Sequence, residues 1–402
     1  MPSPRFRGSF TQQAPIPEVG IAAAVEVMRS GRLHRYNTGP GEVSEAAALE
    51  RDFAAWQGAR YCLALASGGQ AMQIAMRAAG VGPGDTVLTN AFTLAPVPGA
   101  IAALGARPAL VEITLDLVLD LDDFDAKARA TGARFLLLSH MRGHLCDMDR
   151  LMAIAAARGV TVIEDCAHTM GAAWAGRRSG GFGLVGCFST QTYKHMNSGE
   201  GGLLTSDDAG FMARATILSG SYMLHDRHGA GPEAAAFADA RLDMPNLSAR
   251  MDNLRAALLR PQIGELDANV VRWNARHDRL ADRLRGQPAI RLPVRPPQER
   301  YVGSSVQFTV PGIASGEAAA FVARAAADGV EIKWFGAAEP AGFTSSHRSW
   351  RYMEPQALPR TDAVLAGLFD MRLPLTFDLA DCDVIAEIIA DAAAEAGLAA
   401  AE

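Results

Sequence analysis

Three side chains in the middle of the chain, together with a glycine turn, form a pattern that can do chemistry. Asp165 ends an apolar, strand-like run, and Lys194 follows about 30 residues later in a loop, five residues after Ser189. A Ser-Gly-Gly turn (67–69) stands earlier, before a helical pattern. An amine can form an imine with an aldehyde, a carboxylate can keep a ring nitrogen protonated, and N–H groups at a helix N-terminus can bind phosphate. Pyridoxal 5'-phosphate requires these groups.

Each of these features also has a purely structural explanation. An Asp at a strand end often caps a helix, a lysine in a loop is usually only solvated, and a Ser-Gly turn before a helix is commonly a turn and a cap. The combination of all of them, in this order along one chain, predicts the cofactor site.

Short apolar runs alternate with helix-length segments along the chain. This alternation predicts the strands and helices that position these residues. The runs are YCLALAS (61–67), TVLTN (86–90), ARPALVEI (106–113), FLLLSH (135–140) and VTVIED (160–165). Continuous apolar strands of this length are typical of parallel strands buried on both faces, so we predict a doubly wound α/β sheet. Ligands bind at the carboxyl ends of such strands, where Ser67, Asn90, His140 and Asp165 fall.

The pattern changes after about residue 240. Residues 248–284 are predicted to form one long helical region, broken near Pro261. Short strands such as SVQFTV (305–310) then alternate with helices. We therefore expect three parts: an N-terminal arm (1–35), a large cofactor-binding α/β domain (36–245), and a long helix with a small C-terminal α+β domain (246–402).

Composition excludes several classes of protein. The 402 residues are 49% hydrophobic and 20% charged, as in soluble globular enzymes, and the net charge of -6 gives no electrostatic footprint for nucleic acid. No signal peptide or membrane span is expected. The five cysteines are scattered without a CxxC pair, which argues against a disulfide framework and against a metal site. We expect a cytoplasmic protein.

The chain resembles the DegT–DnrJ–StrS family of sugar aminotransferases along nearly its whole length. The stretches that carry the resemblance are LERDFAAWQGARYCLALASGGQAMQIAM (49–76), GVGPGDTVLTNAFT (80–93), SHMRGHLCDMD (139–149), VIEDCAHTMGA (162–172), FSTQTYKHMNSGEGG (188–202), ARMDNLRAALLRPQI (249–263) and LPL (373–375). The family belongs to fold type I of the pyridoxal phosphate enzymes. The resemblance therefore implies a large domain with a mostly parallel, seven-stranded type of sheet, and a smaller C-terminal α+β domain.

The resemblance also implies roles for particular residues. Lys194 matches the lysine that forms the imine with the cofactor, and Asp165 matches the carboxylate that pairs with the pyridine nitrogen. His168 occupies the position near the cofactor's phenolic oxygen, and Ser189 matches a phosphate-binding serine.

Three further positions match the family's cofactor-binding and dimer motifs. Gly68 and Gly69 match the phosphate turn, where relatives often have Thr or Ala. Arg250 matches a position that reaches across a dimer interface toward the phosphate, which implies a homodimer with shared active sites.

Four further positions are candidate site residues, and some of them depart from the family pattern. Leu94 replaces the aromatic or His that stacks on the pyridine ring, so either the cofactor is held less tightly or another ring, such as Phe92, substitutes. Arg142 stands where relatives have Tyr, and it pairs either with a substrate anion or with a nearby acid in a structural salt bridge. Lys333 either shapes a substrate pocket or lies on the surface, and His195 either lines the site or is a polar loop residue.

The predicted reaction is transfer of an amino group from glutamate or glutamine to a keto group of a sugar-like acceptor. The acceptor stays open between a nucleotide-linked keto sugar, a keto-cyclitol and a small anionic keto acid. One alternative is another pyridoxal phosphate reaction, such as a lyase or dehydratase reaction, although dehydratases of this family replace the lysine with His. The other is a catalytically silent regulator, against which the intact Lys194, Asp165 and Ser189 argue.

Overall fold

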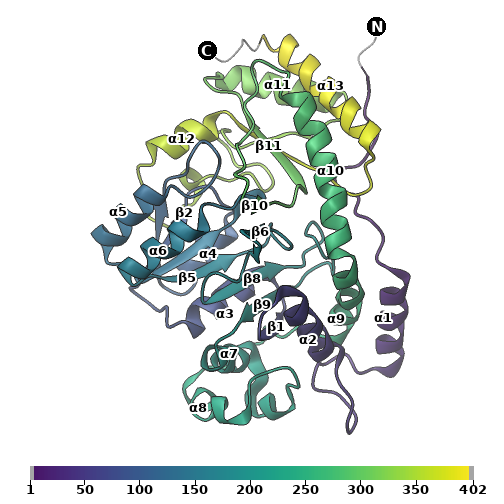
Figure 1. Ribbon diagram of the computed structural model, residues 1–402, viewed down its shortest axis with the longest axis vertical. Helices are drawn as coiled ribbons and strands as arrows, with labels where there is room; N and C mark the ends of the chain where they lie inside the picture. Colours follow the sequence, from purple (N-terminus) through teal and green to yellow (C-terminus); the bar gives the residue numbers. More distant parts are fainter. Residues whose placement is uncertain (1–3, 398–402) are drawn as a thin grey trace.

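The computed structural model describes residues 4–397 and is built around a seven-stranded sheet (Figure 1). Its strands, in spatial order, are β1 (Tyr61–Leu65), β9 (Gly202–Ser206), β8 (Val185–Ser189), β5 (Thr161–Asp165), β4 (Phe135–Ser139), β2 (Thr86–Asn90) and β3 (Arg107–Val111). The four contacts from β8 to β3 are parallel, and β9 runs antiparallel to both of its neighbours. This confirms the predicted α/β fold with a mostly parallel sheet.

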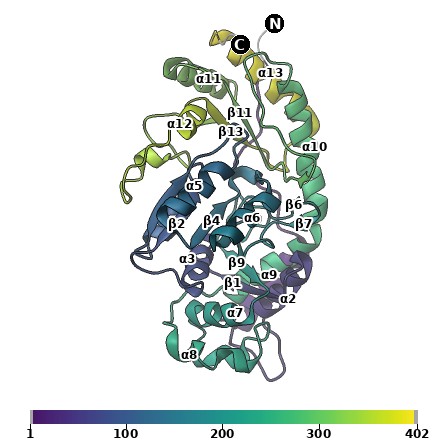
Figure 2. The ribbon, with the colours of Figure 1, turned by 60° about the vertical axis from the view of Figure 1, so that its left-hand side comes forward.

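Helices cover both faces of this sheet because successive strand residues point to opposite sides. Leu137 and Ile163 pack on one side with α3 (Gly68–Ala78), α4 (Pro96–Ala102) and α7 (Ala209–Thr216). Leu136 and Val162 pack on the other side with α5 (Leu121–Thr131) and α6 (Met148–Arg158). Helix α2 (Glu45–Gln57) packs on β1. Figure 2 shows these layers from the side of β2 and β4.

A second, three-stranded antiparallel sheet lies toward the C-terminus. Its order is β11 (Ser305–Thr309), β13 (Leu368–Arg372) and β12 (Lys333–Trp334). Val306 and Phe308 of β11 and Phe369 and Met371 of β13 pack in one core with α10 (Leu266–Leu284), α11 (Ser315–Ala327) and α13 (Leu379–Glu395). The alternate residues of the same strands therefore face away from these helices.

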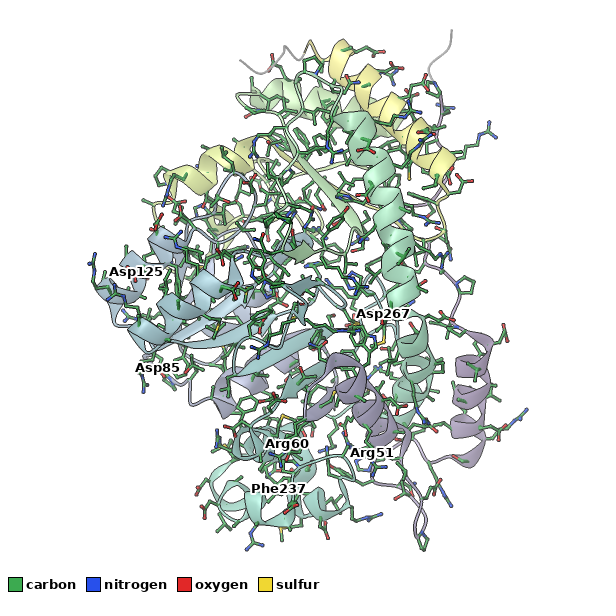
Figure 3. All side chains as sticks on the ribbon, in the orientation of Figure 1. Arg51, Arg60, Asp85, Asp125, Phe237 and Asp267 are labelled. Carbon is green, nitrogen blue, oxygen red and sulfur yellow. The ribbon has the colours of Figure 1, made fainter. Side chains whose placement is uncertain are left out.

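The connection between the two sheets breaks where the sequence predicts it. Helix α9 (Asn253–Leu259) is followed by a 3-10 segment (Arg260–Glu265) that contains Pro261, and α10 starts after it. Asp267 in the first turn of α10, labelled in Figure 3, accepts hydrogen bonds from Trp56 (3.4 Å) and Arg178 (3.3 Å). These bonds attach the start of α10 to α2 and to β7, which contain Trp56 and Arg178.

The N-terminal segment touches both parts of the molecule. Helix α1 (Glu18–Ser30) packs on α9 (Figure 1), while the rings of Phe6 and Phe10 each lie 5.0 Å from Phe377 in the C-terminal core. The N-terminal segment therefore links the two parts, and the division into an arm, a large domain and a C-terminal domain stays our proposal.

The remaining elements are short, apart from α12. They are α8 (Ala240–Asp243), α12 (Pro359–Ala366), the strands β6 (Ala173–Trp174), β7 (Arg177–Arg178) and β10 (Glu299–Arg300), a π-helical turn (Ile217–Ser221), and the 3-10 segments Met141–Gly143, Tyr222–Arg227, Ala234–Phe237 and His347–Ser349. Among residues 4–397, no helix has both the length and the apolar character needed to cross a bilayer.

Candidate active site

A pocket of about 490 Å³ lies at the carboxyl ends of the large sheet's strands. Among the residues that line it are most of those selected from the sequence: Gly68, Gly69, Leu94, Arg142, Asp165, His168, Ser189 and Lys194. Parallel strands bring their carboxyl ends to one edge of the sheet, which explains why residues so distant in the chain meet there.

Asp165 is held in place by neighbouring strand ends. It is the last residue of β5, and it lies opposite Ser139, the last residue of β4. The Ser139 hydroxyl donates to Asp165 Oδ2 (2.9 Å), and the backbone N–H of Ala167 donates to Oδ1 (3.1 Å). Thr93 Oγ1 donates in turn to Ser139 Oγ (2.8 Å). These bonds fix the direction in which the carboxylate faces the pocket.

Lys194 lies in the loop between β8 and β9, and this loop closes on itself through its backbone. The N–H of Lys194 donates to the Gln191 carbonyl (2.8 Å), and the N–H of Thr192 donates to the Gly199 carbonyl (3.0 Å). The amine Nζ lies 2.8 Å from His168 Nε2. The loop therefore presents the lysine amine to the pocket beside a second titratable group.

The electrostatic surroundings favour an uncharged lysine. Burial, and then the positive charge of Arg142, lower the pKa of Lys194 to about 7. Burial, and then the charge of Lys194, hold the pKa of His168 well below its ordinary value. These effects increase the neutral fraction of the Lys194 amine at neutral pH, and a neutral amine can act as a nucleophile or a base.

The N-terminus of α3 forms an anion cradle at another part of the pocket. The helix begins at Gly68, with Ser67 as its cap, whose hydroxyl accepts from the N–H of Gln70 (3.1 Å). A Cβ added to Gly68 would lie 2.8 Å from Ser189 Cβ, so only glycine allows this approach. The free N–H groups of the first helical turn and the Ser189 hydroxyl suit a phosphate. With Asp165 and Lys194 in the same pocket, the residues present fit pyridoxal phosphate.

Leu94 lines the pocket, but Phe92 does not replace the missing aromatic ring. Phe92 is buried in a core cluster with Leu94 beside it, and its ring packs edge-on against Phe335 at 5.2 Å. The suggestion that Phe92 stacks on the cofactor is therefore wrong, because the sheet turns it into the protein interior. Tyr193 and Phe343 are the phenyl rings that line the pocket.

The structure shows one of the two alternatives for Arg142, a salt bridge to an acid, and pairing with a substrate anion stays a prediction. Its guanidinium forms an ion pair with the buried carboxylate of Asp370 (2.7 Å), and it also lines the pocket. Arg372 lines the pocket two residues after Asp370, with its guanidinium 3.8 Å from the centre of the Tyr193 ring.

Lys333 lies beside this cluster rather than on the pocket wall. It is directly opposite Asp370 in the pairing of β12 with β13. Burial, and then the charge of Arg372, lower the pKa of Lys333 to about 8. Its amine lies 5.7 Å from the centre of the Phe343 ring, and that ring lines the pocket.

The structure does not bring His195 or Arg250 to this pocket. His195 turns to the other side of the loop, with Nε2 3.1 Å from Ser304 Oγ and its ring packed edge-on against Trp273 at 5.1 Å. Burial lowers its pKa to about 3. Arg250 donates to the Gly220 carbonyl of its own chain.

Sequence reasoning missed Ser139, Tyr193, Asp370 and Arg372. A signal existed for two of them, because the segment LFDMR (368–372) has Phe369 and Met371 in alternation with Asp370 and Arg372. In a strand that alternation places the two charged residues on one face, opposite the core.

Comparisons with known proteins agree with this geometry. Residues 17–390 match the DegT/DnrJ/EryC1/StrS aminotransferase family. The dTDP-3-amino-3,4,6-trideoxy-alpha-D-glucose transaminase of Streptomyces venezuelae is 33% identical over 288 residues, which are 69% of this chain and 68% of the relative. The L-glutamine:2-deoxy-scyllo-inosose aminotransferase of Streptomyces lividus is 31% identical over 256 residues, 63% of this chain and 60% of the relative.

Solved structures have the same fold over nearly the whole chain. The crystal structure of 3-amino-5-hydroxybenzoic acid synthase superposes with a TM-score of 0.83 at 25% identity, and the match covers 98% of this chain and 100% of that one. The family and the fold predicted from the sequence are thereby confirmed. The chain belongs to the DegT/DnrJ/EryC1/StrS family and is a pyridoxal phosphate-dependent aminotransferase of fold type I.

Proposed function

We propose that Lys194, Asp165 and His168 form the catalytic centre of an aminotransferase that acts on a sugar-like ring ketone. The observation that carries this proposal is the 2.8 Å contact between Lys194 Nζ and His168 Nε2, in a pocket that also contains Asp165 and the N-terminus of α3. One pocket therefore contains an amine, a carboxylate and an anion cradle.

Each part of the cofactor has a partner in this proposal. The N–H groups at Gly68 and Gly69 and the hydroxyl of Ser189 would hold the phosphate, Asp165 would pair with the pyridine nitrogen, and Leu94 would pack against the ring. When bound, pyridoxal phosphate supplies an aldehyde that takes up the amino group and a ring that withdraws electrons.

The chain's own contribution to the reaction is proton transfer and positioning. Lys194 Nζ takes the proton from the substrate carbon that bears the nitrogen and later returns one. Burial and the charge of Arg142 lower the pKa of this amine, which favours the neutral form that can accept a proton. His168, neutral because its pKa is well below the ordinary value, orients Nζ through the 2.8 Å contact.

The relatives suggest the substrates. One relative is named as a transaminase of a dTDP-linked amino sugar and another as a glutamine-dependent aminotransferase of an inosose. Glutamate or glutamine as the donor and a ring ketone as the acceptor are therefore the pair that we propose for this chain.

We further propose a cytoplasmic homodimer that binds neither membranes nor nucleic acid. All five cysteines are unpaired and buried, as expected in a reducing compartment, and the net charge is -6. Tyr222, Met223 and Leu242 are more than half exposed, with 57%, 73% and 78% of their surface accessible. Exposed apolar side chains suit a subunit interface, and light scattering would test for the dimer.

The test is a half-reaction with purified protein loaded with pyridoxal phosphate. Release of 2-oxoglutarate from glutamate, followed by amination of ring ketones, is measured for the wild type, Lys194→Ala and the control Lys127→Ala. We expect Lys194→Ala to lose about 100- to 10,000-fold in turnover and the control to stay near wild type. Turnover retained in Lys194→Ala, or a protein that takes up no cofactor, would refute the proposal.

A further inference from the structure

We propose that Arg142 and Arg372 form a carboxylate-binding site in the active-site pocket, and that the acceptor is a ring ketone bearing a carboxylate. This inference rests on the proposed function and narrows its substrate class. Both arginines line the pocket, and they come from different parts of the fold, Arg142 from the segment after β4 and Arg372 from the end of β13.

Arg142 is placed to bind a ligand rather than only to hold the protein together. Its residue is 5% exposed, yet its Nε makes no hydrogen bond to any of residues 4–397. Its backbone φ is 56°, a left-handed conformation that is uncommon outside glycine. A buried guanidinium N–H without a partner is costly, and a carboxylate bound in the pocket would supply that partner.

The charges around the pocket are not balanced by the protein. Three cations, Arg142, Arg372 and Lys333, surround one buried acid, Asp370, which also accepts a hydrogen bond from Gln307 (2.8 Å). Repulsion among these cations adds to burial in lowering the pKa of Arg372 and of Lys333. Asp370 pairs with Arg142, and the exposed Glu331 also acts electrostatically on Lys333, so the cations of this cluster outnumber the acids by one. An anionic substrate would neutralise that excess charge.

Other acids at the pocket do not compensate these cations. Asp165 and Glu200 are the acids that line it among the residues the structure describes. Asp165 is assigned to the cofactor, and Glu200 is exposed to solvent. The positive cluster therefore stays available to the substrate.

The position of Arg142 favours a carboxylate on the ring itself. Arg142 and Lys194 line the same pocket. An anion bound to the Arg142 guanidinium would therefore share the pocket with the reacting carbon. A ring carboxylate is joined directly to a ring carbon, whereas the diphosphate of a nucleotide sugar is joined through a bridging oxygen and carries a nucleoside as well.

The reaction has two halves, and the need for an anion beside Arg142 applies to the acceptor half as well as to the donor half. Donor and acceptor occupy the same pocket in turn in a ping-pong reaction. The donor amino acid brings a carboxylate, and a neutral acceptor would leave the buried Nε of Arg142 without a hydrogen-bond partner in the second half of the cycle. An acceptor with its own carboxylate keeps the site satisfied in both halves.

The first experiment measures binding without turnover. Calorimetry compares cyclohexanecarboxylate with cyclohexanecarboxamide, a neutral analogue of similar shape, on the pyridoxal phosphate holoprotein. We expect the acid to bind at least about 10-fold tighter than the amide, as for one charge-assisted hydrogen bond. Arg142→Gln and Arg372→Gln should abolish the difference, and the control Arg276→Gln, on α10, should retain it. Equal binding of the two compounds by the wild type would overturn the proposal.

The variant Arg142→Gln needs a matching double variant, because removing the Arg142 charge leaves the buried Asp370 carboxylate uncompensated. If Arg142→Gln does not fold, the double variant Arg142→Gln/Asp370→Asn removes both charges and should show the same loss of preference. Arg372→Gln, at a half-buried position on β13, tests the same site without touching the ion pair.

The second experiment separates donor from acceptor. The amino form of the holoprotein is mixed with 3-oxocyclohexanecarboxylate or its carboxamide, and the amination rates are compared. We expect an acid preference of at least about 10-fold in the wild type that is lost in Arg142→Gln. Loss confined to the glutamate half-reaction would assign the site to the donor and overturn the acceptor claim. A protein that aminates no ketone would count against the proposed function instead, while the binding experiment would still test the carboxylate site.

Discussion

Lys194 should make the protein less stable when the cofactor is absent. Replacing it with Met removes a titratable amine from a confined position and keeps a side chain of similar length. The folded protein binds the lysine proton more weakly than the unfolded chain does, because the pKa falls from 10.5 to about 7 on folding. Stability is therefore lost when the pH falls through this interval, and the loss is complete below about pH 7.

The size of this effect follows from the same pKa. Each tenfold change in a protonation equilibrium is worth about 1.4 kcal/mol, so the full change corresponds to about 5 kcal/mol for an amine without access to water. Lys194 is partly accessible to solvent, and screening lowers the expected penalty to about 2–3 kcal/mol. Apo Lys194→Met should be more stable than the apo wild type by this amount at pH 7.

The assay is urea denaturation of both apoproteins at equal concentration, at pH 6.5, 8 and 9.5. Comparison at each pH cancels the other titrating groups. The advantage of Lys194→Met should be largest at pH 6.5, smaller at pH 9.5, and absent above the unfolded pKa of 10.5. An advantage that does not change with pH would show that the pKa of Lys194 is not lowered, and the explanation of its reactivity would fall with it.

Three further predictions test the rest of the pocket. Asp165→Asn should keep the fold, seen in an unchanged melting curve of the apoprotein, and lower turnover by at least about 100-fold; turnover near wild type would remove Asp165 from the mechanism. Gly68→Ala should weaken cofactor binding by about 10-fold or more, measured by fluorescence titration, because the new Cβ would lie 2.8 Å from Ser189. Phe92→Ala should cost about 3–5 kcal/mol of unfolding free energy, while Leu94→Ala should weaken cofactor binding; the opposite pattern would place Phe92 in the site.

The sequence predicted the parts of the site that depend on order along the chain. Gly68, Asp165 and Ser189 lie at strand or helix ends, and parallel strands bring such ends together whatever the details of packing. The large sheet and the helix break at Pro261 followed from patterns of the same local kind.

The parts that sequence reasoning missed depend on contacts between distant segments or on the direction of one side chain. The ion pair of Arg142 with Asp370 joins residues far apart in the chain, and no local pattern specifies it. Lys194 and His195 are neighbours in one loop, yet they face opposite sides of it. Phe92 and Leu94 belong to the same core cluster, yet of the two only Leu94 also lines the pocket, whereas the Phe92 ring packs against Phe335.

The residues proposed to bind the cofactor and those proposed to bind the substrate come from different sheets. This arrangement has a consequence for how substrate specificity can change in such enzymes. The side chains proposed to hold the cofactor lie at strand ends and in loops of the large sheet, whereas Asp370 and Arg372 belong to a strand of the small sheet. Replacements at Asp370 and Arg372, the alternate positions of β13 that face away from the C-terminal core, can therefore change the substrate while the reacting groups keep their places. Directed evolution of this scaffold should begin at positions 370 and 372, where two codons control part of the charge that a substrate meets.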